Sequence, residues 1–428
     1  MNKELLKRII VENQRTVSSI NLVRRQDNMV DDCNYVMVGI RQAGKSYMMF
    51  QRMQDLVSRG ISPERMLYIN FDDERLIGTV AQELGDILDA YRELFDCEPY
   101  IFMDEIQNIT GWEHFARRLS NERHHVCITS SNARMLSRDI ATTLGGRYIC
   151  RPVFTFDFDE FLALQGITLS TTSLYGSEAC TIARHMDSYL AFGGFAQLAT
   201  LPNKREWLNN IFARIFFGDI ISRNNVRNEA ALRLTVRRMA ESVMQPTTYT
   251  RLTNLIKSAG ASVSRNTVMD YVRYLQDACM TFTLSNIAGK FAERETTPKH
   301  YFSDNGLLSI FLSEGHAQLL ENFVAIALHR RYLSQTGEPR VFYYRHNVEV
   351  DFYIPEVSTA IQACYSLSDA ETERRETVAL QKFAAAYDVH RLIIVTHDDD
   401  RVVRTSDGRE IEVIAAWRWA VGMAGEQQ

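Results

Sequence analysis

The stretch NYVMVGIRQAGKS, residues 34–46, decides the fold of the N-terminal part of the chain. Apolar residues before Gly39 predict a buried strand, and YMMFQRMQDLV (47–57) predicts the helix that follows. The residues between them fit GxxxxGK[ST], and a strand, this loop and a helix in this order make a P-loop. The alternative is a glycine-rich turn that contains Lys-Ser by chance, and the flanking strand and helix argue against it.

The predicted loop has the chemistry to bind a nucleoside triphosphate. Gly39 and Gly44 let the backbone curl so that N–H groups point at phosphate oxygens, next to the positive end of the helix. Lys45 is expected to reach the β- and γ-phosphates, and Ser46 to bind Mg²⁺ through its hydroxyl. ATP and Mg²⁺ are therefore the expected cofactors. The residues predicted to surround the nucleotide are Gly39, Ile40, Arg41, Gln42, Ala43, Gly44, Lys45, Ser46 and Tyr47.

A second apolar run, PYIFMDE (99–105), ends in two adjacent carboxylates. In P-loop proteins an acidic residue at the end of a neighbouring buried strand holds the metal, and Asp104 is predicted to do so. Glu105 is predicted to orient and deprotonate the attacking water. The alternative is that the pair only caps the next helix, but its position after Lys45 suits a Walker B strand. These residues favour ATP hydrolysis.

Two further polar groups are candidates for the catalytic machinery. HHVCITSS (124–131) predicts a strand that leads to Asn132, which we expect to sense the γ-phosphate, although a polar turn or helix cap there is an equally good interpretation. Arg147 stands before the strand YICRPV, beyond reach of its own P-loop, and is a candidate arginine finger toward a neighbouring subunit. A surface or intradomain ion pair is the alternative for Arg147.

The alternation of strands and amphipathic helices from residue 34 to about 155 predicts a parallel α/β sheet with helices on both faces. Helical spacing dominates afterwards, and mixed strands and helices return near the C-terminus. We expect four domains: a P-loop domain of AAA+ type (1–160), a helical lid or connector (161–245), a winged-helix-like domain (246–315) and a C-terminal α/β domain (316–428).

Net charge, cysteine pattern and hydrophobicity argue against several classes of protein, but they do not indicate a partner. A net charge of -5 argues against a wholly basic nucleic-acid coat. The seven cysteines are scattered and form no CxxC pair, so neither a zinc site nor a disulfide framework is expected. No signal peptide or membrane span is predicted, and we expect a cytoplasmic protein.

With these motifs the chain resembles the prokaryotic AAA-type ATPases in which an AAA_14 domain is followed by a DUF4143 domain. The resemblance implies the ATPase machinery just described and leaves the physiological partner open. It rests on an ordered set of segments: GIRQAGKS, INFDDERL, FMDEIQNITGWEHFARRL, ITSSNARMLS, LGGRY, FDEFL, YLAFGGFAQL, YFSDNGLL, ENFVAIAL and VEVDFYI.

The region after the ATPase domain has the order of a winged helix. A helix, a turn near Gly260, a second helix opened by Ser264 and a strand follow one another over residues 248–284. DNA contact through the helix near Arg265 is one interpretation, and a protein-packing module is the other. The region is locally basic, with Arg251, Lys257, Arg265, Arg273 and Lys290 against Asp270 and Asp277.

The last hundred residues resemble the PD-(D/E)xK nuclease-like tail of these ATPases. Such a nuclease needs carboxylates around a metal and a lysine that activates water. Glu321 and Asp351 remain, but Gln362 and Cys364 stand where Glu-x-Lys is expected. We therefore predict a degenerate domain without nuclease activity.

Two functions are consistent with these residues. The first is an oligomeric ATPase in which Mg²⁺-dependent hydrolysis drives conformational change in the C-terminal domains, and the presence of Glu105 favours it. The second is a signalling module with little turnover, in which ATP occupancy gates recognition of DNA or of a protein.

Overall fold

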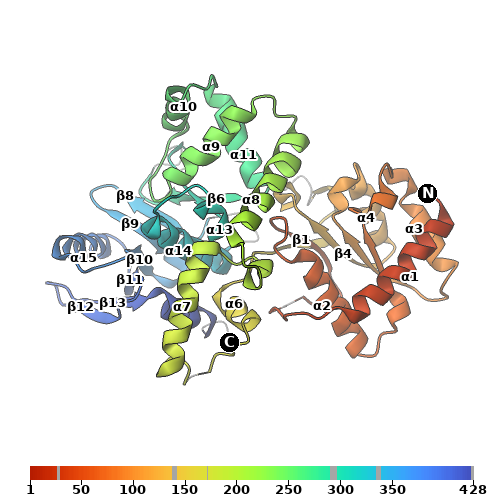
Figure 1. Ribbon diagram of the computed structural model, residues 1–428, viewed down its shortest axis with the longest axis horizontal. Helices are drawn as coiled ribbons and strands as arrows, with labels where there is room; N and C mark the ends of the chain where they lie inside the picture. Colours follow the sequence, from red (N-terminus) through yellow and green to blue (C-terminus); the bar gives the residue numbers. More distant parts are fainter. Residues whose placement is uncertain (27–28, 137–141, 171, 290–295, 334–338, 426–428) are drawn as a thin grey trace. The chain divides into compact units, whose positions relative to one another are not determined.

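In the computed structural model the chain divides into two compact units (Figure 1). The first comprises Met1–Phe154 with Asp277–Cys279, and the second comprises Thr155–Gln276 with Met280–Gln428. The structure describes residues 1–428 apart from 27–28, 137–141, 171, 290–295, 334–338 and 426–428.

The first unit is built on a parallel five-stranded sheet with the strand order β2-β3-β4-β1-β5. Each strand predicted between residues 34 and 155 is present, and the apolar runs of β1 to β4 are almost wholly buried, as expected of a parallel sheet covered on both faces, while the edge strand β5 is partly exposed. β1 pairs with β4 and β5, so the chain leaves β1 for the P-loop between two neighbouring strands. The strands are β1 (Asn34–Val38), β2 (Met66–Asn70), β3 (Tyr100–Asp104), β4 (His125–Ser130) and β5 (Tyr148–Pro152).

Helices cover both faces of this sheet, which confirms the predicted α/β class (Figure 1). The N-terminal helix begins where the Asn2 side chain accepts hydrogen bonds from N–H groups of the first turn. Leu6, Ile9 and Ile10 recur at helical spacing and are buried in the core of the unit. The helices are α1 (Lys3–Ser19), α2 (Lys45–Ser58), α3 (Gly85–Arg92) and α4 (Trp112–Asn121).

The second unit opens with helices. Their apolar faces supply buried side chains such as Phe158, Leu190, Phe212 and Leu232. Residues Ile215–Ser222 continue α8 as π-helical turns. The helices are α6 (Phe158–Leu164), α7 (Ser177–Phe192), α8 (Lys204–Arg214), α9 (Glu229–Glu241), α10 (Tyr249–Ser258) and α11 (Arg265–Asp277).

An eight-stranded mixed sheet forms the rest of the second unit, in the order β12-β13-β11-β10-β9-β8-β6-β7. The strands are β6 (Thr281–Asn286), β7 (Lys299–Phe302), β8 (Phe342–Arg345), β9 (Glu349–Ile354), β10 (Thr359–Ala363), β11 (Arg391–Thr396), β12 (Arg401–Arg404) and β13 (Glu410–Ala415). Its helices are α13 (Asn305–Ser309), α14 (His316–Tyr332), α15 (Ala370–Ala384) and α16 (Ala416–Gly425).

The strand pair predicted after the winged-helix segment belongs to this large sheet. β6 pairs antiparallel with β7 and parallel with β8, through Ser285 opposite Phe342. One sheet therefore contains strands from both sides of residue 315, the predicted boundary between the third and fourth domains. The four-domain division remains a prediction. Within the described ranges no helix is both long enough and apolar enough to span a membrane.

Candidate functional site

Glycine is required at two positions of the loop between β1 and α2. The Gly39 N–H donates to the Ser130 carbonyl at 3.2 Å, and a Cβ at residue 39 would lie 1.9 Å from the Val153 carbonyl oxygen. Gly44, which caps α2, has φ of +94°, a conformation that side chains with a Cβ rarely adopt. The loop is therefore tightly bounded by the ends of β4 and β5.

Lys45 lies inside this loop. It is only 3% exposed, and its ammonium donates to the carbonyls of Gly39 at 2.9 Å and Ile40 at 3.1 Å. Its Nζ is also 3.7 Å from the Glu105 carboxylate. Because Lys45 is the first residue of α2, its positive charge adds to that of the helix N-terminus, which favours an anion here.

Asp104 ends β3 as a buried carboxylate among hydroxyl donors. Tyr68 donates to it at 2.8 Å, and the hydroxyls of Thr129 and Ser46 also hydrogen-bond to it. Burial raises the pKa of Asp104, and the hydrogen bonds from Ser46 and Thr129 oppose that rise. A serine hydroxyl beside a carboxylate is the pair of oxygen ligands that Mg²⁺ takes in a P-loop, so the residues present fit this metal.

Glu105 has an unusual backbone conformation, with φ of 51°, in the left-handed region. Such a residue costs about 1–3 kcal/mol and persists where its surroundings hold it. Here its N–H donates to the Thr129 hydroxyl at 2.9 Å, and its carboxylate accepts from Ser131 at 3.2 Å and from Gln107. Burial opposes ionisation, but the charge of Lys45 and these hydrogen bonds hold the pKa of Glu105 below its usual value. Glu105 is therefore an ionised carboxylate next to the loop.

Other predicted residues of the loop differ in exposure. Arg41 lies 3.5 Å from the Asp72 carboxylate, and Gln42 has φ of 63°. Ile40 and Ala43 are buried. The Tyr47 side chain is 53% exposed, so it lies at the surface of α2.

Asn132 follows β4 and takes part in a local turn. Its N–H donates to the Ser130 hydroxyl at 3.1 Å, and its side-chain oxygen accepts from the Arg134 N–H at 3.1 Å. This is the polar-turn contact that the sequence left open, and the sensor role of Asn132 stays a prediction. Its neighbour Ser131 is the residue that contacts Glu105.

Arg147 precedes the edge strand β5 and is exposed. It stands at the amino end of the parallel sheet, whereas the P-loop and Asp104 follow carboxyl ends of strands. The structure therefore does not bring Arg147 to the P-loop of its own chain, and its action on a neighbouring subunit stays a prediction.

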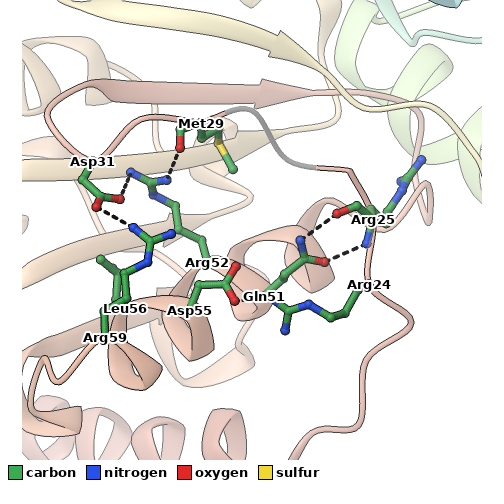
Figure 2. A pocket seen from close by; sticks show the side chains of 9 residues that line it. All are labelled: Arg24, Arg25, Met29, Asp31, Gln51, Arg52, Asp55, Leu56 and Arg59. Atoms are coloured by element: carbon green, nitrogen blue, oxygen red, sulfur yellow. Dashed lines mark hydrogen bonds and ion pairs between the residues drawn. The ribbon is translucent and has the colours of Figure 1, made fainter. Parts of the chain in front are cut away.

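The structure also reveals a support for the loop that no motif indicated. The Gln51 amide hydrogen-bonds both backbone groups of Arg25, at 2.9 Å each, as Figure 2 shows. The Arg25 guanidinium donates to the carbonyls of Ala43 at 3.1 Å and Phe154 at 3.0 Å. Gln51 thereby fixes a side chain that ties the P-loop to the segment after β5. A pocket of about 190 Å³ adjoins it, lined by Arg24, Arg25, Met29, Asp31, Gln51, Arg52, Asp55, Leu56 and Arg59.

In the second unit, the predicted winged-helix residues divide into core and surface. Tyr271 and Leu275 on α11 are buried. The basic residues described on α10 and α11 are exposed, while Lys290 lies outside the described residues. They are Arg251, Lys257, Arg265 and Arg273.

The predicted nuclease-like residues come together. Glu321 on α14, Asp351 on β9, Gln362 on β10 and Cys364 all line one pocket of about 1230 Å³. Burial raises the pKa of Cys364 to about 11, so its thiol stays protonated near neutral pH. The thiol therefore offers no base where a lysine was expected.

The strand order, the P-loop between β1 and α2, and the acidic pair after β3 define an AAA-type, P-loop ATPase-like domain. Comparison with protein families agrees: an AAA domain, AAA_14, matches residues 32–162 and DUF4143 matches residues 316–418. A further domain of unknown function, DUF8612, matches residues 183–317 between them. The chain thus has an AAA_14 domain followed by a DUF4143 domain, as its motifs predicted.

Two relatives are similar to this chain over most of its length. An uncharacterized protein of Methanocaldococcus jannaschii is 27% identical, over 98% of this chain and 96% of its own length. One of Haemophilus influenzae is 29% identical, over 69% of this chain and 74% of its own. The chain is also similar to a solved structure, the Walker-type ATPase of Pyrococcus abyssi, at 12% identity, with 72% and 95% of the two chains covered and a TM-score of 0.37.

Proposed function

We propose that the chain is a cytoplasmic ATPase that hydrolyses ATP with Mg²⁺ and couples its nucleotide state to conformational change in its C-terminal region. The observation that carries the proposal is Glu105, a partly buried carboxylate with a lowered pKa, held beside Lys45. A carboxylate that stays ionised at neutral pH can accept the proton of an attacking water.

Each residue of the loop has a separate task in this proposal. Lys45 and the N–H groups of the loop bind the β- and γ-phosphates of ATP. Ser46 and Asp104 would hold Mg²⁺, which neutralises charge on the transferring phosphoryl group when bound. Glu105 orients the water and takes its proton, while Ser131 and Thr129 fix the position of Glu105.

The proposed partners rest on exposed basic residues. Exposed Arg147 at the edge strand supports a homo-oligomer in which it reaches a neighbouring nucleotide. Exposed Arg251, Lys257, Arg265 and Arg273 support a DNA contact through α10 and α11, and a protein partner would use the same surface.

The test compares ATP turnover and ATP binding in Glu105→Gln. This change keeps the shape of the side chain and removes the base, so turnover should fall by roughly 10²-fold or more while ATP still binds. Glu74→Gln makes the same chemical change at an exposed position of the same unit and should leave both quantities unaltered.

The results also separate the two candidate functions. Release of phosphate by the wild type that is lost in Glu105→Gln supports the ATPase. Tight ATP binding with no more turnover in the wild type than in Glu105→Gln would favour the nucleotide-gated binding module instead.

A further inference from the structure

The nuclease-like fold implies a divalent metal between Glu321 and Asp351, and the structure places a different cation there. Lys299, the first residue of β7, reaches both carboxylates. Its side chain is fully buried, with an exposed fraction of 0%. A buried charge of this kind persists only when it is paired.

Three carboxylates surround the Lys299 ammonium. Its Nζ is 2.9 Å from Asp351 Oδ1, 3.1 Å from Glu349 Oε1 and 3.2 Å from Glu321 Oε1. The Tyr301 hydroxyl also donates to Glu321, at 2.7 Å. Carboxylates from α14 and β9 thus converge on one point, and the ammonium lies at that point.

The remaining polar groups of the cluster are paired within the protein. The second oxygen of Asp351 accepts from the Ala363 N–H at 3.1 Å. Gln362 accepts from the Asp351 N–H at 2.8 Å and donates to Glu376 at 2.8 Å. Gln362 therefore uses its amide to hold β9 and α15 and presents no carboxylate to a metal.

The carboxylates around Lys299 favour its charged form. Burial opposes it, but the neighbouring carboxylates of Asp351 and Glu321 outweigh burial and hold the pKa of Lys299 well above its usual value. The Lys299 ammonium, within ion-pair distance of all three carboxylates, supplies the positive charge that they need.

A divalent metal does not fit beside this ammonium. Mg²⁺ or Ca²⁺ binds oxygen ligands at roughly 2.0–2.6 Å and would have to occupy the space that Nζ fills between Glu321 and Asp351.

We propose that Lys299 replaces the divalent cation of the nuclease-like domain, and that its removal opens a divalent-cation site formed by Glu321, Glu349 and Asp351. The same carboxylates that would bind a metal are kept together by an internal ammonium. The domain therefore keeps the fold of a nuclease, while the buried Lys299 ammonium occupies the position of the metal. This inference does not depend on ATP turnover.

The experiment titrates the full chain with Mn²⁺, without nucleotide, and follows free Mn²⁺ by electron paramagnetic resonance. All variants carry Asp104→Asn so that the P-loop does not contribute. Lys299→Met should bind one Mn²⁺ per chain, roughly 10-fold or more tightly than its parent, because the carboxylates lose their internal cation. Adding Asp351→Asn should abolish that binding, and Lys382→Met, at an exposed lysine, should not create it.

Two results would overturn the proposal. One is Mn²⁺ binding by the parent that Asp351→Asn removes, since a metal would then bind in the presence of Lys299. The other is a folded Lys299→Met that takes up no Mn²⁺. If Lys299→Met is unfolded without metal, recovery of its near-UV circular dichroism in Mn²⁺ supports the proposal, and failure to recover it overturns the proposal.

Discussion

A single methyl group at Gly39 tests how closely the P-loop is fitted to the strands around it. In Gly39→Ala the new Cβ would lie 1.9 Å from the Val153 carbonyl oxygen, while such contacts shorter than 3.0 Å essentially never occur. Because the contacted oxygen belongs to the backbone and cannot rotate away, the loop must move by about 1 Å or more. Crowding of this kind destabilises by about 1–3 kcal/mol, and a 1 Å displacement at a site costs roughly 10²-fold in function.

The assay is isothermal titration of the folded variant with ATP and Mg²⁺. Gly39→Ala should bind ATP roughly 10²-fold more weakly than the wild type, with a lower unfolding temperature. Gly85→Ala is the matched control, because a Cβ at Gly85 meets only the Arg118 side chain at an ordinary 3.5 Å. Wild-type ATP affinity in Gly39→Ala would refute the close fit of loop and strand.

Three other predictions address the subunit contact, the second unit and the nuclease-like domain. Arg147→Ala should bind ATP normally but hydrolyse it slowly, by up to about 10³-fold, and mixing it with Lys45→Ala subunits should restore part of the ATPase rate. Burial lowers the pKa of His300 to about 4. The His300 imidazole therefore takes up a proton near pH 6.5 in the unfolded chain, but only near pH 4 in the folded chain. Because protonation then favours the unfolded chain, the free energy of unfolding should fall by up to about 3 kcal/mol as the pH drops from 6.5 to 4. In His300→Phe, chemical denaturation across this range should show a smaller pH dependence. The purified chain should cleave neither linear, circular nor single-stranded DNA with added metal.

Each of these predictions has a result that contradicts it. Mixed subunits no more active than either variant alone, in an assembly shown to exchange subunits, would make Arg147 a structural residue. An unchanged pH dependence in His300→Phe would show that its burial does not control acid stability. Cleavage of DNA that disappears in Asp351→Ala would show an active nuclease.

Local patterns were sufficient to predict the ATPase part of the fold. The run 34–46 contains its own strand, turn and helix start, and PYIFMDE contains the whole of β3, which ends at Asp104. Contacts between strands were harder to predict. Thr129 meets Asp104 because β3 and β4 are neighbours, with Met103 opposite Ile128, and strand order is a property of the whole sheet.

The second unit shows why the remaining residues were missed. Lys299 follows a segment with no motif, and it reaches Asp351 only because β7 joins β6 and β6 joins β8 in the same sheet. That junction rests on Ser285 and Asn286 opposite β8, too short a pairing to leave a pattern. The Gln362 and Cys364 substitutions were visible in the sequence, but the cation that compensates them was not.

Isothermal titration with ATP and Mg²⁺ tests the central claim most directly, in the wild type and in Lys45→Ala. Lys45 is the buried cation of the loop, and its ammonium is expected to bind the β- and γ-phosphates. The wild type should bind one ATP per chain, and Lys45→Ala, with unchanged circular dichroism, should show no tight binding. Equal ATP affinity in the two folded proteins would contradict the P-loop assignment on which the proposed function rests.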